Sequence, residues 1–270
     1  MENNTQQFKG FWAIILGGSS GFGLASVEKL SKHGMNIAVL YREPAAAEKP
    51  LLTKFSILAQ NSDTTILPYN INALDEGGRI KFINAFIASV NKQKCVRVLL
   101  HSIARGNLKP LAEDDKQAGN TLTVEDIQHT TYAMSNSLVD WARLLLKENL
   151  FSKDARIIGL TSEGANKFWE GYAAVSIAKA SLKSLATYMA VEFAKYGLKT
   201  NLIQAGVTET PSLKRIPGSK TLLQYAAQLN PSGRITKPED VANVIYLLCT
   251  DEAAWINGSL IHVDGGEHCR

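Results

Sequence analysis

The stretch WAIILGGSSGFG, residues 12–23, carries the strongest signal of the fold. Five apolar residues come first, and a continuous apolar run of this kind is typical of a strand buried on both faces of a sheet. Glycines follow at positions 17, 21 and 23, and this GxxxGxG spacing lets the backbone turn tightly and approach a ligand closely. A helical pattern then covers residues 23–33 and ends at Gly34. A glycine-rich turn between a strand and a helix start is typical of pyrophosphate binding, and the alternative is a tight turn without a ligand.

The alternation of short apolar runs with helical patterns continues along the whole chain. Strands are predicted at residues 12–16, 36–40, 64–69, 96–100, 156–160, 199–204 and 259–263. Helices are predicted at residues 23–33, 50–59, 75–90, 124–149, 172–196 and 238–248, with a surface loop at 105–120. We therefore predict an α/β fold, a single doubly wound Rossmann domain over residues 1–270 with a seven-stranded parallel sheet flanked by helices. Its ligand is expected at the carboxyl ends of the strands, near the switch in strand order.

Composition excludes several classes of protein. The 270 residues are 45% hydrophobic and carry a net charge of +4 without a block of Lys and Arg, so no nucleic-acid partner is expected. Three cysteines without a CxxC pair argue against a disulfide framework or a zinc site and fit a reducing cytoplasm. The polar N-terminus does not resemble a signal peptide, and no apolar run is long enough to span a membrane. We predict a cytoplasmic protein.

A tyrosine and a lysine stand out in GYAAVSIAK, residues 171–179. Tyr172 and Lys179 are separated by six residues, nearly two helical turns, so both face one side if the helix already begins at the tyrosine. Val175 lies four residues before the lysine and Ser162 lies seventeen before it. The alternative for Tyr172 is a packing residue at the start of the helix.

These features resemble the short-chain dehydrogenase/reductase family over nearly the whole chain. LGGSSGFG (residues 16–23) resembles the family's TGxxxGxG, with Leu16 in place of threonine, and GRITKPEDVANVIYLLCTDEAAWINGSLIHVDGG (residues 233–266) resembles its C-terminal pattern. The common branch has YxxxK and a serine thirteen residues before the tyrosine; Val175 and Ser162 occupy those positions here.

The wider Tyr-x6-Lys spacing is similar to that of the enoyl-acyl-carrier-protein reductase branch, as is HSIA at residues 101–104. AGVTET (residues 205–210) stands where that branch has AGPIRT, so Val207 replaces a proline and Glu209 an arginine. Ser162 also stands where many members have a first tyrosine.

The resemblance implies an NADPH- or NADH-dependent enzyme that reduces the 2,3 double bond of a trans-2-enoyl thioester in fatty-acid synthesis. Its substrate would be carried by acyl carrier protein or coenzyme A, and the chain would form a homotetramer. Tyr172 would stabilise the thioester oxygen, Lys179 would hold the nicotinamide ribose and lower the pKa of the tyrosine, and Ser162 would tune the pocket. The alternatives are a carbonyl reductase or alcohol dehydrogenase of the same family, or a non-catalytic NADP(H)-binding relative.

The same resemblance assigns the cofactor-binding residues. They are Gly17, Ser19, Ser20, Gly21, Phe22 and Gly23 in the turn, Arg42 after the second strand, Asn70 and Ile71 beside the adenine, Ser102, Ile103 and Ala104 beside the ribose, Lys179, and Gly206, Val207 and Thr210 near the carboxamide or pyrophosphate. No acid occurs at residues 40–42, and the guanidinium of Arg42 suits a 2′-phosphate, so NADPH is favoured. Residues 207–229 would contain a substrate lid with a bend at Pro217 and Gly218.

Five further residues are weaker candidates. His101 is expected to be a packing or hydrogen-bonded residue rather than an acid. Asn136 is placed where common-branch enzymes have an asparagine that relays protons through water. His262, His268 and Cys269 near the C-terminus do not have the spacing of metal ligands, and no metal site is predicted.

Overall fold

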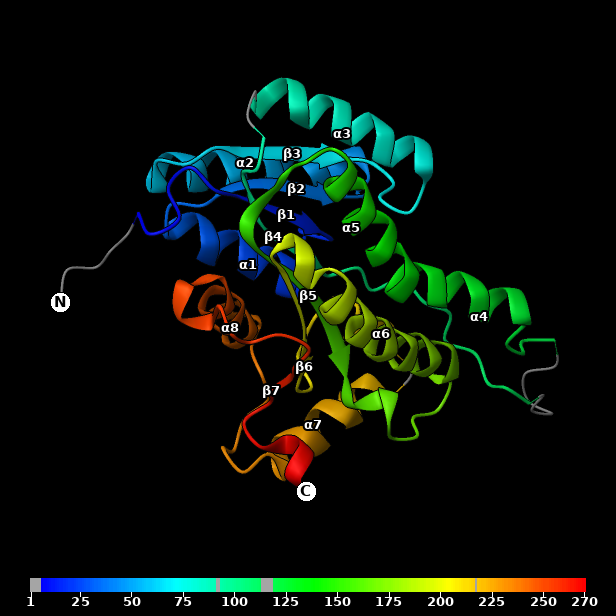
Figure 1. Ribbon diagram of the computed structural model, residues 1–270. Coiled ribbons are helices and arrows are strands. Elements are labelled where there is room, and N and C mark those ends of the chain that lie inside the picture. Colours follow the sequence, from blue (N-terminus) through cyan, green and yellow to red (C-terminus); the bar gives the residue numbers. More distant parts are fainter. Residues whose placement is uncertain (1–5, 91–92, 113–118, 217) are drawn as a thin grey trace.

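The computed structural model describes residues 6–90, 93–112, 119–216 and 218–270. Within them, seven parallel strands form one sheet in the order β3-β2-β1-β4-β5-β6-β7 (Figure 1). The strands are β1 (Trp12–Leu16), β2 (Asn36–Tyr41), β3 (Ile66–Asn70), β4 (Val96–His101), β5 (Phe151–Ser162), β6 (Leu198–Ala205) and β7 (Leu260–Val263). The predicted doubly wound α/β fold with a seven-stranded parallel sheet is confirmed.

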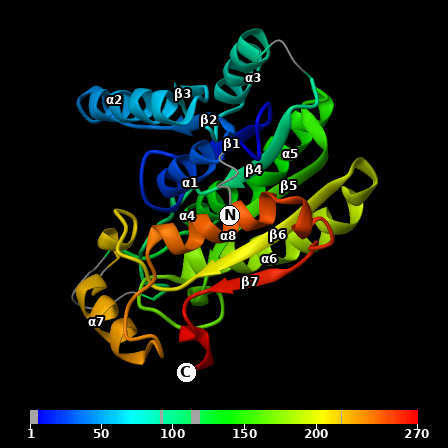
Figure 2. The same ribbon diagram turned by 90° about the vertical axis from the view of Figure 1, so that its left-hand side faces the viewer.

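Helices cover both faces of this sheet (Figures 1 and 2). One layer contains α1 (Gly21–Lys32), α2 (Ala45–Ser62) and α8 (Pro238–Cys249), and the other contains α3 (Glu76–Val90), α5 (Ser137–Lys147) and α6 (Ala173–Glu192). Successive side chains of a strand point to opposite faces. Ile14 and Leu16 of β1 accordingly pack with the second layer, whereas Ala13 and Ile15 pack with the first. This arrangement explains why β1 is apolar along its whole length.

The strand order changes direction between β1 and β4. From β1 the chain proceeds to β2 and β3 on one side, then returns to place β4 on the other side of β1. In open α/β sheets, ligands bind at such a change of direction, outside the carboxyl ends of the strands. The glycine-rich turn, residues 17–20, begins at this point.

Several elements differ from their predicted bounds. Helix α2 begins at Ala45, five residues before Pro50, with the extended backbone of Pro44 at its N-cap. Proline is tolerated near a helix start, so Pro50 does not mark the first residue. The helix predicted at 124–149 is divided into α4 (Val124–Thr131), a π-helical turn at Tyr132–Asn136 and α5.

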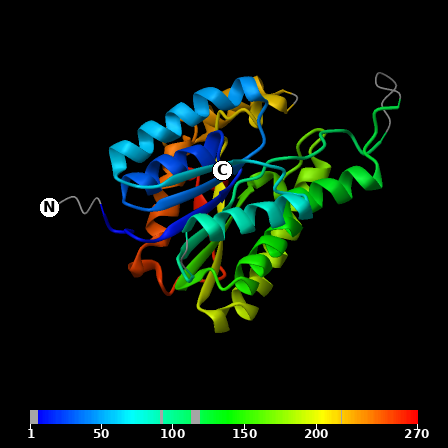
Figure 3. The same ribbon diagram turned by 90° about the horizontal axis from the view of Figure 1, so that it is seen from above.

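The largest omission is α7 (Ser219–Leu229), which falls within the expected lid. It begins after Gly218, whose φ of 72° is left-handed, and Pro217 lies outside the described residues. Figure 3 shows the molecule from above, with α4 extending away from the sheet. No helix within the described ranges is long and apolar enough to cross a membrane.

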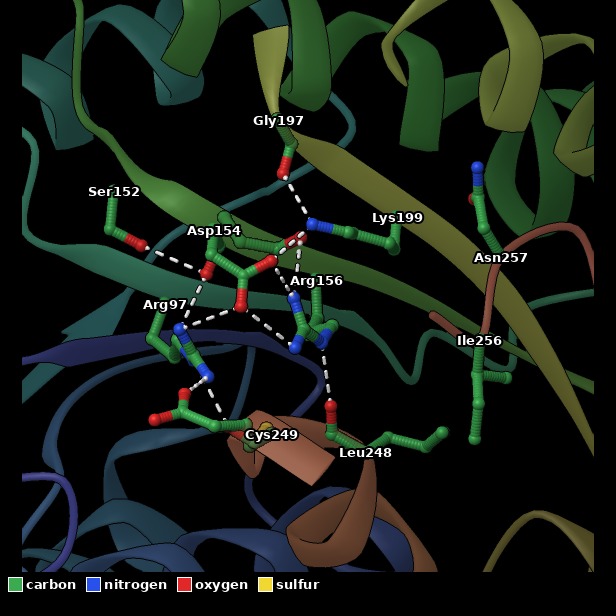
Figure 4. Close-up of polar contacts among 12 residues, drawn as sticks. Arg97, Ser152, Asp154, Arg156, Gly197, Lys199, Leu248, Cys249, Ile256 and Asn257 are labelled. Atoms are coloured by element: carbon green, nitrogen blue, oxygen red, sulfur yellow. Dashed lines mark hydrogen bonds and ion pairs between the residues drawn. The ribbon is translucent and has the colours of Figure 1, made fainter. Parts of the chain in front are cut away.

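Two buried arginines join the end of α8 to the sheet, at the opposite ends of the strands from the glycine-rich turn (Figure 4). Arg97 of β4 donates from Nε to the Cys249 carbonyl at 3.0 Å, and Arg156 of β5 donates to the Leu248 carbonyl at 2.7 Å. Both guanidiniums also pair with Asp154, at 3.1 Å and 2.6 Å. The positive charges lie where the helix dipole is negative, so they stabilise the end of α8.

Candidate active site

The glycine-rich turn after β1 holds its shape through close backbone contacts. Gly17 has a φ of +87°, and its N–H donates to the Leu40 carbonyl at 2.9 Å. A Cβ added at Gly17 would lie 2.5 Å from the Ser102 carbonyl oxygen, and one at Gly23 would lie 2.1 Å from the Gly17 oxygen. Glycine is required at both positions because a side chain would overlap backbone atoms. The turn thereby packs against the residues that follow β4, including Ile103.

The start of α1 is suited to an anion. Its N-cap residue, Ser20, makes no side-chain cap hydrogen bond, and the first turn has no acidic residue. The first N–H groups of a helix have no intrahelical acceptors and carry the positive end of the dipole. Gly21 faces Thr210, whose Cγ2 would lie 3.3 Å from a Cβ at that glycine. The fold thus brings the predicted residues of the turn and Thr210 together, and their donors fit a dinucleotide pyrophosphate.

The edge expected to face the adenosine ribose contains an acid that the sequence analysis missed. Ser19 donates from Oγ to Glu43 Oε1 at 2.8 Å. Asn70 is also tied to Glu43, since its Nδ2 donates to the Glu43 carbonyl at 2.8 Å. Arg42 is exposed. Glu43 lies one residue beyond residues 40–42, where an acid that binds the ribose would be expected. The turn of the chain after β2 brings its carboxylate to Ser19.

The predicted catalytic residues converge on the carboxyl end of β5. Tyr172 Oη lies 3.3 Å from Ser162 Oγ, the last residue of β5. Lys179, of which 6% is exposed, donates from Nζ to the Leu160 carbonyl at 2.6 Å. Burial lowers the pKa of Lys179 to about 8. A hydroxyl, a tyrosine and a buried amine are thus held beside one strand end.

Two expectations about Tyr172 need correction. The tyrosine is the N-cap of α6 and precedes the first helical residue, Ala173, so it reaches Ser162 from outside the helix. Burial raises its pKa, against the lowering effect of the Ser162 hydrogen bond. The expected lowering by Lys179 is not found, because the desolvation of the buried phenol dominates.

The residues around Lys179 include apolar side chains that pack together and a histidine with a hydrogen bond. Val175, at the position of the common-branch tyrosine, is buried with Ala133, Met134 and Ala178. His101 is 1% exposed, and its Nε2 lies 2.9 Å from Ser137 Oγ. Burial, followed by the charge of Lys179, lowers the pKa of His101 to about 3, so the ring is neutral. This agrees with a hydrogen-bonded packing role.

Asn136 does not face the site. It is exposed, whereas its neighbours Ser135 and Ser137 are buried. The π-helical turn adds a residue to the helix and rotates the following face, which the assumption of a continuous α-helix did not include. The predicted relay position is therefore wrong for Asn136.

The loop after β6 is anchored by a buried carboxylate. The Val207 N–H donates to Glu267 Oε2 at 3.2 Å, and the Val207 carbonyl accepts from the Thr236 N–H at 3.1 Å. Both polar backbone groups expected to face a carboxamide therefore have protein partners in this structure. Burial raises the pKa of Glu267. This role of Glu267 was not predicted. The related branch has proline at the position of Val207, and proline has no N–H that could donate to a carboxylate. Gly206 is packed closely, with Thr236 Oγ1 2.4 Å from where its Cβ would be.

Comparisons with known proteins point to one group of enzymes. A family model described as enoyl-(acyl carrier protein) reductase matches residues 17–268. The enoyl-[acyl-carrier-protein] reductase [NADH] FabI of Aquifex aeolicus is 31% identical over 174 residues, which are 63% of this chain and 62% of that protein, less than two thirds of its length. The 3-oxoacyl-[acyl-carrier-protein] reductase of Synechocystis sp. is 28% identical over 258 residues, 94% of this chain and 95% of that protein. The crystal structure of the enoyl-[acyl-carrier-protein] reductase (NADH) from Aquifex aeolicus matches with a TM-score of 0.80 and 25% identity, covering 98% of each chain.

Proposed function

Because this chain belongs to the enoyl-acyl-carrier-protein reductase branch of the short-chain dehydrogenase/reductase family, we propose that it reduces the 2,3 double bond of a trans-2-enoyl thioester. The observation that carries the proposal is the position of the tyrosine, which is residue 172 here and would be residue 175 in the common branch. Val175 is buried where the common branch has its tyrosine, and Tyr172 reaches Ser162 from one turn further back. With no hydroxyl at residue 175, the substrate oxygen would lie beside Tyr172, which suits an acyl chain that is reduced at its β-carbon.

The chain's own residues would divide the work as follows. A reduced nicotinamide dinucleotide, when bound, supplies the hydride. The turn from Gly17 to Gly23 and the start of α1 would bind its pyrophosphate, and Lys179 would hold its ribose. As negative charge develops on the thioester oxygen, the Tyr172 hydroxyl donates a hydrogen bond to it. The buried ammonium of Lys179 adds a positive field that is weakly screened.

The cofactor we propose is NADPH, because the exposed guanidinium of Arg42 suits a 2′-phosphate. Glu43 opposes this preference, since its carboxylate is held by Ser19 at the same edge. The name of the Aquifex aeolicus relative specifies NADH. We further propose an acyl-carrier-protein or coenzyme A thioester as substrate, α7 as part of the lid, a homotetrameric assembly and a cytoplasmic location.

A second candidate is reduction of a 3-oxoacyl thioester. The Synechocystis sp. relative has that name and matches 94% of this chain. Ser162 also occupies the serine position of the common branch and bonds the tyrosine hydroxyl. Turnover of the two substrates, rather than the structure alone, distinguishes the two reactions.

The test is oxidation of NADPH and NADH, followed at their absorption band, with a short trans-2-enoyl thioester and with the matching 3-oxoacyl thioester. We expect turnover of the enoyl substrate, and a fall of roughly 100-fold in kcat for Tyr172→Phe, the usual loss on removing an oxyanion donor. Tyr188→Phe, an exposed tyrosine of α6, is the matched control and should leave the rate unchanged. Turnover of the 3-oxoacyl substrate alone would favour the second candidate, and dinucleotide binding without any turnover would favour a non-catalytic relative.

A further inference from the structure

The C-terminal turn aligns a cysteine, a histidine and an aspartate. Cys269 Sγ lies 3.5 Å from His268 Nε2, and His268 Nδ1 lies 2.6 Å from Asp264 Oδ2. Cys269 is exposed, whereas Asp264 is 4% exposed. No group of three side chains able to hold a metal ion is found in the described part of the chain. The three residues instead have the order of a nucleophile, a base and an orienting carboxylate.

The orientation of the histidine follows from the contacts of the carboxylate. Asp264 accepts from the N–H of Gly266 at 3.0 Å and from the N–H of His268 at 3.1 Å, so its position is fixed by backbone. Since a carboxylate accepts hydrogen bonds, the ring proton of His268 lies on Nδ1. Nε2 therefore presents its lone pair to the thiol. The ring of His262 stacks on that of His268 with centroids 3.9 Å apart and further restricts its rotation.

A cavity of about 440 Å³ adjoins His268. The side chains of Asn230, Ser232 and Arg234 line it, and they already donate hydrogen bonds to the Asp264 carbonyl, the Gly265 carbonyl and the Asp240 carboxylate. The cavity therefore provides space for a small molecule beside the histidine, rather than free donors.

We propose that Cys269 is a thiol–disulfide exchange site for a small disulfide. His268 Nε2 accepts the thiol proton, and the Cys269 sulfur forms a bond with one sulfur of the reagent while the reagent's own S–S bond breaks. The departing thiolate takes the proton from His268. Cys269 is thus oxidised to a mixed disulfide and the other half of the reagent is reduced to a thiol. No residue of the Tyr172 site takes part, so this activity is independent of the proposed reductase reaction.

The other two cysteines provide internal controls. Cys95 and Cys249 are fully buried, and burial raises the pKa of Cys249 to about 12. Burial in apolar surroundings makes a thiol inert. One mixed disulfide per chain is therefore expected, and protection of the two buried thiols reports that a variant is folded.

The experiment measures the rate at which glutathione disulfide adds to the native chain near pH 7, by intact mass. We expect one adduct, absent in Cys269→Ser. Free cysteine is only a few per cent thiolate at neutral pH, so the gain from a positioned base is limited to tens of fold. We expect His268→Gln to slow the addition by roughly tenfold.

The matched control is His129→Gln, an exposed histidine of α4, which should leave the rate unchanged. An equal rate for His268→Gln and native chains, with Cys95 and Cys249 still protected, would overturn the proposal. So would the absence of any adduct at Cys269. Dinucleotide oxidation by Cys269→Ser should equal that of the native chain, which separates this result from any failure of the proposed reductase activity.

Discussion

The buried amine of Lys179 is the residue on which the proposed chemistry most depends. Its Nζ has the Leu160 carbonyl as a partner, and burial lowers its pKa to about 8. The charged form therefore predominates below about pH 8 and is lost above it. The affinity of the free chain for the reduced dinucleotide should be constant on the acid side and fall roughly tenfold between pH 8 and pH 9.5. Nicotinamide fluorescence measures this, and Lys179→Met should abolish the pH dependence; constant affinity of the native chain to pH 9.5 would contradict it.

The choice of nucleotide should respond in opposite directions to two neighbouring charges. Glu43→Gln removes the carboxylate beside Ser19, so it should raise the affinity for NADPH relative to NADH by about fivefold, the value of roughly 1 kcal/mol for a partly exposed charge. Arg42→Ala should lower the same ratio. The ratio of dissociation constants at low salt is the measurement, because salt screens both charges. Shifts of the same sign in the two variants would exclude this account.

Single residues were predictable from sequence where they belong to a motif. Residues whose partners are brought to them only by the fold were not predictable. Tyr172, Ser162 and Lys179 meet at β5 as the motif implied. Glu43 and Glu267 were missed because their partners are 24 and 60 residues away in sequence. A carboxylate whose partner is distant in sequence has no sequence signature until the chain folds back on it.

The junction of β1 and α1 has no space for a side chain at Gly23, in the first turn of α1. Gly23→Ala would place a methyl group 2.1 Å from the Gly17 oxygen, a backbone atom that cannot move away alone. We expect a loss of about 2 kcal/mol in the free energy of unfolding, typical of overpacking, together with loss of measurable dinucleotide binding. Gly77→Ala is the control, because Gly77 is exposed in α3 and alanine there should add about 0.5 kcal/mol. Denaturant titration checks both values, and equal stabilities would refute the strain.

The elements show which physical signals can be read from sequence. Strands β1, β2 and β4 were found within one residue of their ends, because uninterrupted apolar runs leave little choice. The π-helical turn before α5 was not found, since one inserted residue hardly disturbs an apolar pattern read over many turns. Helix α7 was not predicted either, because its residues were assigned to the substrate lid and Ala226 is its only buried residue.

The whole molecule depends on the buried ion pairs at the ends of the strands opposite the active site. Although burial acts to raise it, hydrogen bonds from Arg156 and Lys199 lower the pKa of Asp154 to about 2. Its contribution to stability is present above the ordinary aspartate value and is lost as the pH falls from about 4 through 2. The free energy of unfolding should therefore decline over this acid range.

Asp154→Asn should remove that contribution at neutral pH. The change leaves the buried guanidinium of Arg156 without a counter-charge, while Arg97 keeps its pair with Asp251, and we expect a loss of about 3 kcal/mol in the free energy of unfolding. Glu28→Gln breaks the exposed pair with Lys54 and should cost less than about 0.5 kcal/mol. Urea unfolding of the two variants provides the comparison, and equal losses would show that burial of the pairs does not increase their contribution to the free energy of unfolding.

The same arginines set an order for folding during translation. Arg97 finds its carbonyl partner 152 residues later, at Cys249, and Arg156 finds its partner 92 residues later, at Leu248. At ordinary rates of translation the first interval lasts about ten to thirty seconds. Throughout that time the central strands hold guanidiniums that can pair with Asp154 but whose carbonyl partners at the end of α8 have not left the ribosome. The central strands therefore gain these last hydrogen bonds only after α8 has been synthesised.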